Sequence, residues 1–72
     1  MMTNKIAIIA PTNNSAVLTA RDHNLSGDDW VRISAREHAI GREFSQMILA
    51  KNWDEVPFAS EVVSLVQTRI RT

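Results

Sequence analysis

The sequence predicts a small α/β protein with the element order βαβαβα, in which a three-stranded parallel sheet carries helices on both faces. Residues 6–10 are apolar without interruption, and residues 46–50 are apolar after Gln46; such runs are typical of strands that are covered on both faces. Segments with helical spacing of apolar residues alternate with the strand-like runs. A chain of 72 residues can build one core, so we expect a single α/β domain over residues 1–72.

The run at residues 6–10 is interpreted as the central strand of the sheet. Pro11 ends it, because proline has no N–H to donate to a central ladder. Residues 12–15 are good helix caps, and we expect a helix over residues 15–23 that buries the small side chains of Ala16 and Ala20. Asn24 can take the left-handed conformation that ends a helix.

Residues 30–34 are aromatic and β-branched with polar alternation, which predicts a second strand at an edge of the sheet. Ser34 and Glu37 have the spacing of a capping box, in which each side chain satisfies a backbone N–H at the start of a helix. We therefore expect a second helix to begin at Ala35.

The length of that second helix has two interpretations. In the first, the helix ends at Ile40, Gly41 is its cap, and residues 46–50 form a third strand. In the second, one helix runs over residues 35–50 and the protein is mostly helical. The repeated order of strand and helix favours the first, since two strands alone would leave one face of the sheet underfilled.

A last helix is expected after residue 56. Pro57 suits the first turn of a helix, where its missing N–H leaves no hydrogen bond unmade. The apolar residues that follow have a period near 3.6 and predict one buried stripe, formed by Ala59, Val62, Val63, Val66 and Ile70.

Composition excludes several classes of protein. Eight Lys and Arg balance eight Asp and Glu, which argues against the cationic face that binding to nucleic acid requires. The chain has no cysteine, so it has neither a disulfide framework nor a thiolate metal site. Its longest apolar run is too short to span a bilayer. We expect a cytoplasmic protein with no membrane association.

Catalysis and metal binding find no support in the sequence. Neither His23 nor His38 has a second ligand at the i, i+4 spacing of a helical metal site. Ser34 and the other serines lack a nucleophile elbow and a neighbouring histidine. We therefore assign no catalytic residue, no metal and no cofactor, and we expect the protein not to be an enzyme.

A candidate ligand site lies where the predicted strands end. Ligands of parallel sheets bind beyond the carboxyl ends of the strands. Hydroxyls, amides and two cations in these loops could bind a carboxylate or a phosphate, and ordinary caps and solvated charges are the other interpretation. The candidate residues are Thr12, Asn13, Ser15, Arg36 and Lys51.

Trp53 suggests a second kind of site, because tryptophan is enriched among interface anchors. It follows the expected third strand in a polar loop, where it either contacts a partner or lies as a lid over the core. Phe58, next to Pro57, has the same two interpretations. Together with Asn52, these residues form the predicted partner-binding set.

Several short motifs give the chain a family resemblance: residues 6–12, Ala16 with 20–21, Leu25, residues 29–31, 40–41 and 47–53. With these motifs the chain resembles small bacteriophage-encoded α/β proteins of uncharacterised function, which are in turn similar to the first βαβ segment of Rossmann-like, nucleotide-handling proteins. The resemblance implies an α/β fold in a phage or prophage protein and transfers no catalytic residue. Residues 11–15 contain no glycine, so the phosphate-binding loop of nucleotide-binding relatives is absent.

The sequence therefore leads to two functional expectations. The first is a non-enzymatic accessory protein of the phage type, which binds either a host protein or a second copy of itself through an exposed edge of its sheet. The alternative is a small module that binds a nucleotide or a phosphate anion at the carboxyl ends of its strands.

Overall fold

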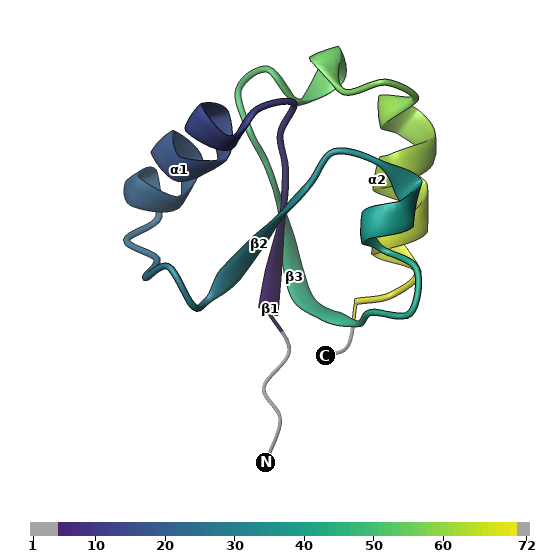
Figure 1. Ribbon diagram of the computed structural model, residues 1–72. Coiled ribbons are helices and arrows are strands. Elements are labelled where there is room, and N and C mark those ends of the chain that lie inside the picture. Colours follow the sequence, from purple (N-terminus) through teal and green to yellow (C-terminus); the bar gives the residue numbers. More distant parts are fainter. Residues whose placement is uncertain (1–4, 71–72) are drawn as a thin grey trace.

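The computed structural model describes residues 5–70. It confirms the predicted parallel sheet of three strands, with the first strand in the centre and the order β2-β1-β3. Two α-helices and two short 3₁₀ turns connect and cover the strands (Figure 1). In chain order the elements are β1 (Lys5–Ile9), α1 (Asn13–Asp22), β2 (Trp30–Ile33), η1 (Arg36–His38), β3 (Phe44–Leu49), η2 (Trp53–Glu55) and α2 (Ala59–Gln67).

The helices cover opposite faces of the sheet. α1 lies on one face, whereas η1 and α2 lie on the other (Figure 1). The chain moves from β1 to β2 in one direction across the sheet and from β2 over β1 to β3 in the other. Because both crossover connections have the same handedness, α1 and η1 lie on opposite faces of the sheet.

The unbroken apolarity of β1 follows from its position between two cores. Ala7 and Ile9 belong to the core beneath α2, which also contains Phe44 and Val62. Ile8 points to the other face, where α1 packs against the sheet through small side chains such as Ala16. Successive side chains of a strand point to opposite faces, so a strand with a core on each side must be apolar throughout.

A third strand is confirmed, although it spans Phe44–Leu49 and not residues 46–50, and the alternative of one helix over residues 35–50 is wrong. The expected helix from Ala35 to Ile40 is reduced to the single 3₁₀ turn η1. Its capping box does not form: Ala35 takes the N-cap position, and the backbone N–H of Ser34 donates to His38 Nδ1 at 3.1 Å. A segment this short gains too few hydrogen bonds to offset helix nucleation. Gly41, with φ of 78°, then redirects the chain toward β3.

The helix α1 agrees with its prediction in its caps and in its buried face. It begins two residues before Ser15, with Thr12 as its N-cap accepting the backbone N–H of Ser15 at 3.2 Å. Ala16 and Ala20 are buried against the sheet, and Asn24 adopts the left-handed conformation with φ of 56°.

The helix α2 encloses Val62 and Val66 of the predicted stripe fully and Ala59 and Val63 partly, whereas Ile70 lies beyond its end. Its start differs from the expectation, because Pro57 lies outside it and the helix begins at Ala59. The residue before a proline is restricted to extended backbone, and Val56 adopts it with ψ of 131°. The turn into the helix is then made by Phe58, whose φ is 56°. None of the helices within residues 5–70 is long and apolar enough to cross a membrane.

Candidate functional site

The predicted partner-binding residues differ in how far they are exposed. Trp53, in η2, is half-buried and packs against the core beneath α2, which agrees with its interpretation as a lid. Asn52 is also half-buried, and its Oδ1 accepts a hydrogen bond from the Ser15 hydroxyl. Phe58 is 73% exposed. Of the three, only Phe58 offers a large apolar side chain to a partner.

The predicted ligand-binding residues are divided between two hollows. Thr12, Ser15 and Lys51 line a hollow of about 860 Å³ beside α1. Arg36 lines a separate hollow of about 770 Å³ between η1 and α2. Asn13 is exposed at the first residue of α1 and lines neither. The five residues therefore do not converge on one ligand.

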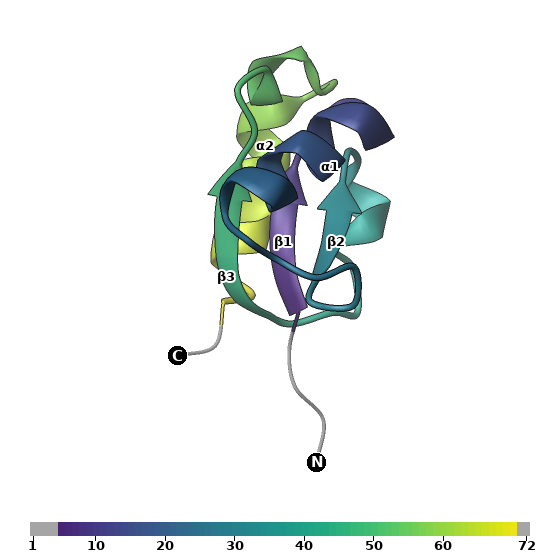
Figure 2. The same cartoon turned by 90° about the vertical axis from the view of Figure 1, so that its left-hand side faces the viewer.

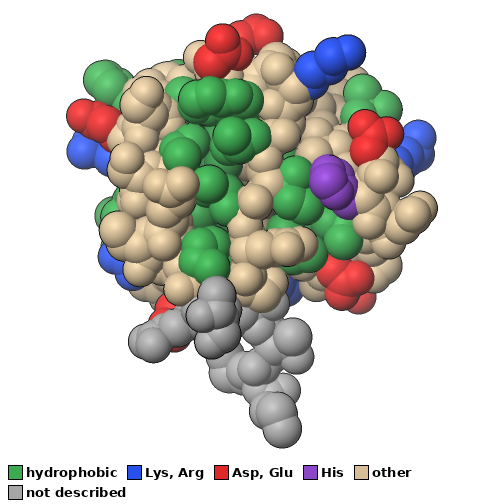
Figure 3. Space-filling view, turned by 180° about the vertical axis from the view of Figure 1, so that it is seen from behind, with side chains coloured by type: hydrophobic (Ala, Val, Ile, Leu, Met, Phe, Trp, Pro, Cys, Tyr) green, Lys and Arg blue, Asp and Glu red, His purple; other side chains and the backbone are tan. Residues whose placement is uncertain are grey.

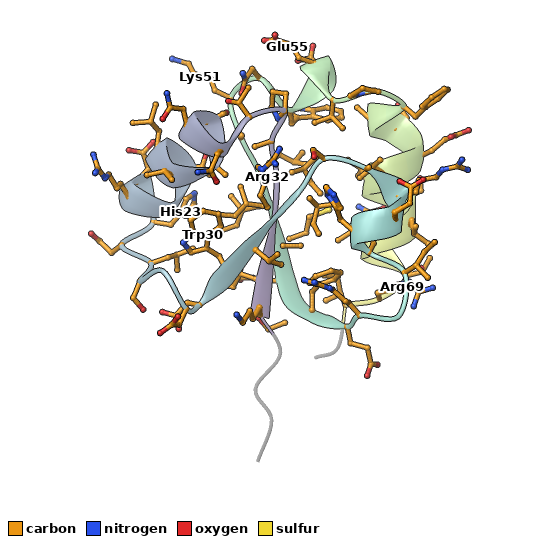
Figure 4. The ribbon with its side chains drawn as sticks, viewed as in Figure 1. His23, Trp30, Arg32, Lys51, Glu55 and Arg69 are labelled. Carbon is orange, nitrogen blue, oxygen red and sulfur yellow. The ribbon has the colours of Figure 1, made fainter. Side chains whose placement is uncertain are left out.

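Hydrogen bonds within the protein already occupy the hydroxyl groups of the larger hollow. Thr12 Oγ1 accepts the helix N–H of Ser15, and the Ser15 hydroxyl donates to Asn52. The Thr19 hydroxyl donates to the Ser15 carbonyl at 2.9 Å. Lys51 extends outward at the top of the molecule, far from His23 at the other end of α1 (Figure 4). The polar side chains of residues 12–15 therefore cap α1, and the hydrogen bond from Ser15 to Asn52 connects α1 to the segment after β3.

The structure brings Ser34 and His38 together, which sequence reasoning missed. His38 Nδ1 lies 3.5 Å from Ser34 Oγ and accepts the backbone N–H of Ser34. The hydroxyl of Ser34 also accepts a hydrogen bond from Arg32 Nη1 at 3.1 Å. Because the backbone N–H uses the lone pair of Nδ1, this nitrogen cannot take a proton from the serine. The spacing of four residues between Ser34 and His38 across a turn was the feature of the sequence that could have predicted this contact. The hydrogen bond between the two residues stabilises η1.

Within residues 5–70, no group of three or more His, Asp or Glu side chains could hold a metal ion. The Asp28–Asp29 pair lies in the exposed turn before β2. Asp29 accepts hydrogen bonds from the Ser26 hydroxyl at 2.6 Å and from its backbone N–H at 3.3 Å, and these bonds lower the pKa of Asp29. The pKa of Asp29 is lowered by hydrogen bonds that stabilise the turn, so the shift does not indicate a functional site.

The remaining candidate is the outer edge of β3, which forms one margin of the sheet (Figure 2). The backbone N–H of Ala50 donates to the Ile9 carbonyl at 3.1 Å, so residue 50 faces β1. Backbone groups alternate in direction along a strand, so those of Met47 and Leu49 face away from β1. No other part of residues 5–70 bonds to these outward groups. We call residues 45–49 the β3 edge.

The β3 edge lacks the features that normally protect a sheet margin. Charged residues, prolines and short strands discourage pairing with other chains. The opposite margin, β2, has four residues and includes Arg32, whose side chain bonds to the Pro11 carbonyl. β3 has six residues with no charge and no proline, and Leu49 is 42% exposed. The face seen from behind carries a strip of hydrophobic side chains (Figure 3).

The end of the described chain protects only the beginning of β3. The backbone N–H of Phe44 donates to the Arg69 carbonyl at 2.9 Å, and Phe44 forms an isolated bridge with Ile70. Within residues 5–70, no further backbone hydrogen bond reaches the outer side of β3 beyond Phe44, and the candidate site is the β3 edge as defined above. Comparison with protein-family models, with curated proteins and with solved structures gave no match.

Proposed function

We propose that this protein is a non-enzymatic binding protein that takes up an extended segment of another polypeptide along its β3 edge. The observation that carries the proposal is an uncharged edge strand with outward backbone groups at Met47 and Leu49. In the setting that the sequence resemblance implies, such a protein is a phage-type accessory factor that acts on a protein partner.

The energetics suit a reversible interaction. Met47 and Leu49 each offer one N–H and one C=O, and each intermolecular hydrogen bond contributes about 1 kcal/mol. Covering the exposed part of Leu49 adds a part of the roughly 1.5–3 kcal/mol that full burial of such a side chain provides. Ordering the two chains opposes these gains. The β3 edge by itself therefore supports moderate affinity and rapid exchange, and specificity depends on the side chains beside it.

Within residues 5–70 the candidate polar residues do not converge on one chemical site, which supports a binding role over catalysis. The Ser34 and His38 pair is tied into η1 by backbone hydrogen bonding. The predicted ligand residues lie in two hollows, and the hydroxyls of the larger one are engaged within the protein. A module for a nucleotide or a phosphate anion has less support for the same reason. A rise in melting temperature with millimolar nucleotide or inorganic phosphate would restore that alternative.

Site-specific photo-crosslinking in cells tests the proposal. A benzophenone amino acid replaces Ser45 on the β3 edge, and in a matched control it replaces Ser60, which is equally polar and exposed on α2. We expect polypeptide adducts from position 45 and none from position 60. Leu49→Pro, which removes an outward N–H from an edge position, should abolish those adducts while circular dichroism shows the fold retained. The same adducts from both positions, or adducts that survive Leu49→Pro, would refute the proposal.

A further inference from the structure

We propose that the segment taken up at the β3 edge is the β3 strand of a second copy of this chain, running antiparallel, so that two sheets join into one of six strands. This inference rests on the proposed function and names its partner. Most homodimers have two-fold symmetry, in which the same patch of each copy meets its equivalent. Two identical edge strands related by such an axis run antiparallel.

The β3 edge is self-complementary because it carries no charge. When two copies of a strand pair antiparallel about a two-fold axis, a charge near the axis lies close to the same charge of the other copy. Phe44–Leu49 has no charged residue, so self-pairing creates no such repulsion. The whole chain also has zero formal net charge, so two copies do not repel at long range. The margin of β2, with Arg32, would place like charges together.

The charges at the two ends of β3 favour the antiparallel orientation. Two cations and one anion lie at its beginning, and one cation and two anions follow its end. An antiparallel partner brings the positive beginning of one strand to the negative end of the other. Figure 4 shows Glu55 at the top of the molecule and Arg69 lower down on its right-hand side. The six residues are Arg42, Glu43 and Arg69 at the beginning and Lys51, Asp54 and Glu55 after the end.

Apolar side chains next to the edge give the dimer a second source of affinity. Leu49 is 42% exposed and Met47 is half-buried in the monomer, and the axis brings each near its equivalent. An interface built on one short edge is smaller than the roughly 1,600 Å² of standard complexes. We therefore expect a monomer and a dimer in rapid, concentration-dependent exchange.

Sedimentation equilibrium over a wide concentration range tests the inference. We expect the wild-type mass to rise toward twice that of one chain. Leu49→Lys places like charges at the interface and should weaken dimerisation at least tenfold. Ile40→Lys is the matched control, because Ile40 is 63% exposed on the η1 side and lies away from the β3 edge. It should leave the dimer unchanged, and circular dichroism should show both variants folded.

A second measurement uses the absence of cysteine from the chain. Leu49→Cys and Ile40→Cys each introduce a single thiol, and a short bis-maleimide should link Leu49→Cys into a dimer and leave Ile40→Cys unlinked. A purely monomeric wild type, up to its solubility limit, would overturn the inference. If Ser45 still crosslinks in cells to a different protein, the proposed function survives that result. A dimer that Leu49→Lys leaves intact would overturn the inference and would place the interface elsewhere.

Discussion

Replacing Phe58 by glycine should give a more stable protein than replacing it by alanine, which is the reverse of the usual order in helices. Phe58 has φ of 56° and ψ of 40° at the N-cap position of α2. For a residue with a Cβ atom, this left-handed conformation costs about 1–2 kcal/mol of conformational free energy, whereas glycine adopts it without this cost. Both variants remove the same aromatic ring, so the comparison isolates the backbone.

The size of the difference follows from two opposing terms. Glycine avoids the left-handed strain of about 1–2 kcal/mol but loses about 0.5–1 kcal/mol more on folding than alanine, because its unfolded chain is freer. We expect a net advantage for glycine of about 0.5–1 kcal/mol. The ring is 73% exposed, so about a quarter of its area, or roughly 50 Å², is lost from the folded contacts. That loss costs each variant about 1.3 kcal/mol relative to the wild type.

Urea unfolding followed by tryptophan fluorescence measures these differences, because Trp53 packs against the core beneath α2. With a slope near 1 kcal/mol per molar urea, the midpoint of Phe58→Gly should lie about 0.5–1 M above that of Phe58→Ala. Ser64, exposed in the middle of α2, is the control. There alanine should be the more stable by about 1 kcal/mol. Equal midpoints at position 58, or a higher one for alanine, would refute the left-handed conformation of Phe58.

Three further substitutions test other parts of the structure. Gly41→Ala should cost about 1 kcal/mol in thermal unfolding, because φ is 78° and no atom crowds the added methyl group. Ile8→Ala should lower the free energy of unfolding by about 3 kcal/mol, since Ile8 is fully buried beside α1. Asp29 should stabilise the fold above its unfolded pKa of about 3.9 and lose this effect as pH falls through its lower folded pKa. Ser26→Ala should raise the Asp29 pKa in an NMR titration and should make the acid-induced fall in melting temperature smaller.

The local sequence was enough to predict most elements of the fold. Continuous apolarity predicted β1, which lies between two layers of side chains, and the apolar residues 47–50 predicted a third strand, although β3 is only partly covered. The period of 3.6 residues predicted the buried face of α2, and the run of cap residues from Thr12 predicted the start of α1 within two residues. These features depend on neighbours along the chain, which is why one sequence reveals them.

The candidate site was predicted less well, because its residues come from separate segments. Arg36 was grouped with Lys51 by its place after a strand, yet η1 carries it to the hollow beside α2. Trp53 packs against the core, whereas Phe58 remains exposed; their local sequences did not distinguish the two. Burial of a side chain depends on what the rest of the chain places above it.

The sequence alone determined that this protein is a parallel α/β unit with a central first strand, since hydrophobic pattern and capping are local properties. Only the tertiary structure decided that residues 36–38 form one 3₁₀ turn, that Ser34 contacts His38, and that no segment within residues 5–70 pairs with the outer side of β3 beyond Phe44. The order of strands, and with it the direction in which the backbone groups of Met47 and Leu49 point, arises from long-range pairing with β1. A strand lies at the edge of a sheet when no strand pairs with its outer side, and strand pairing depends on contacts between segments that are distant in the sequence.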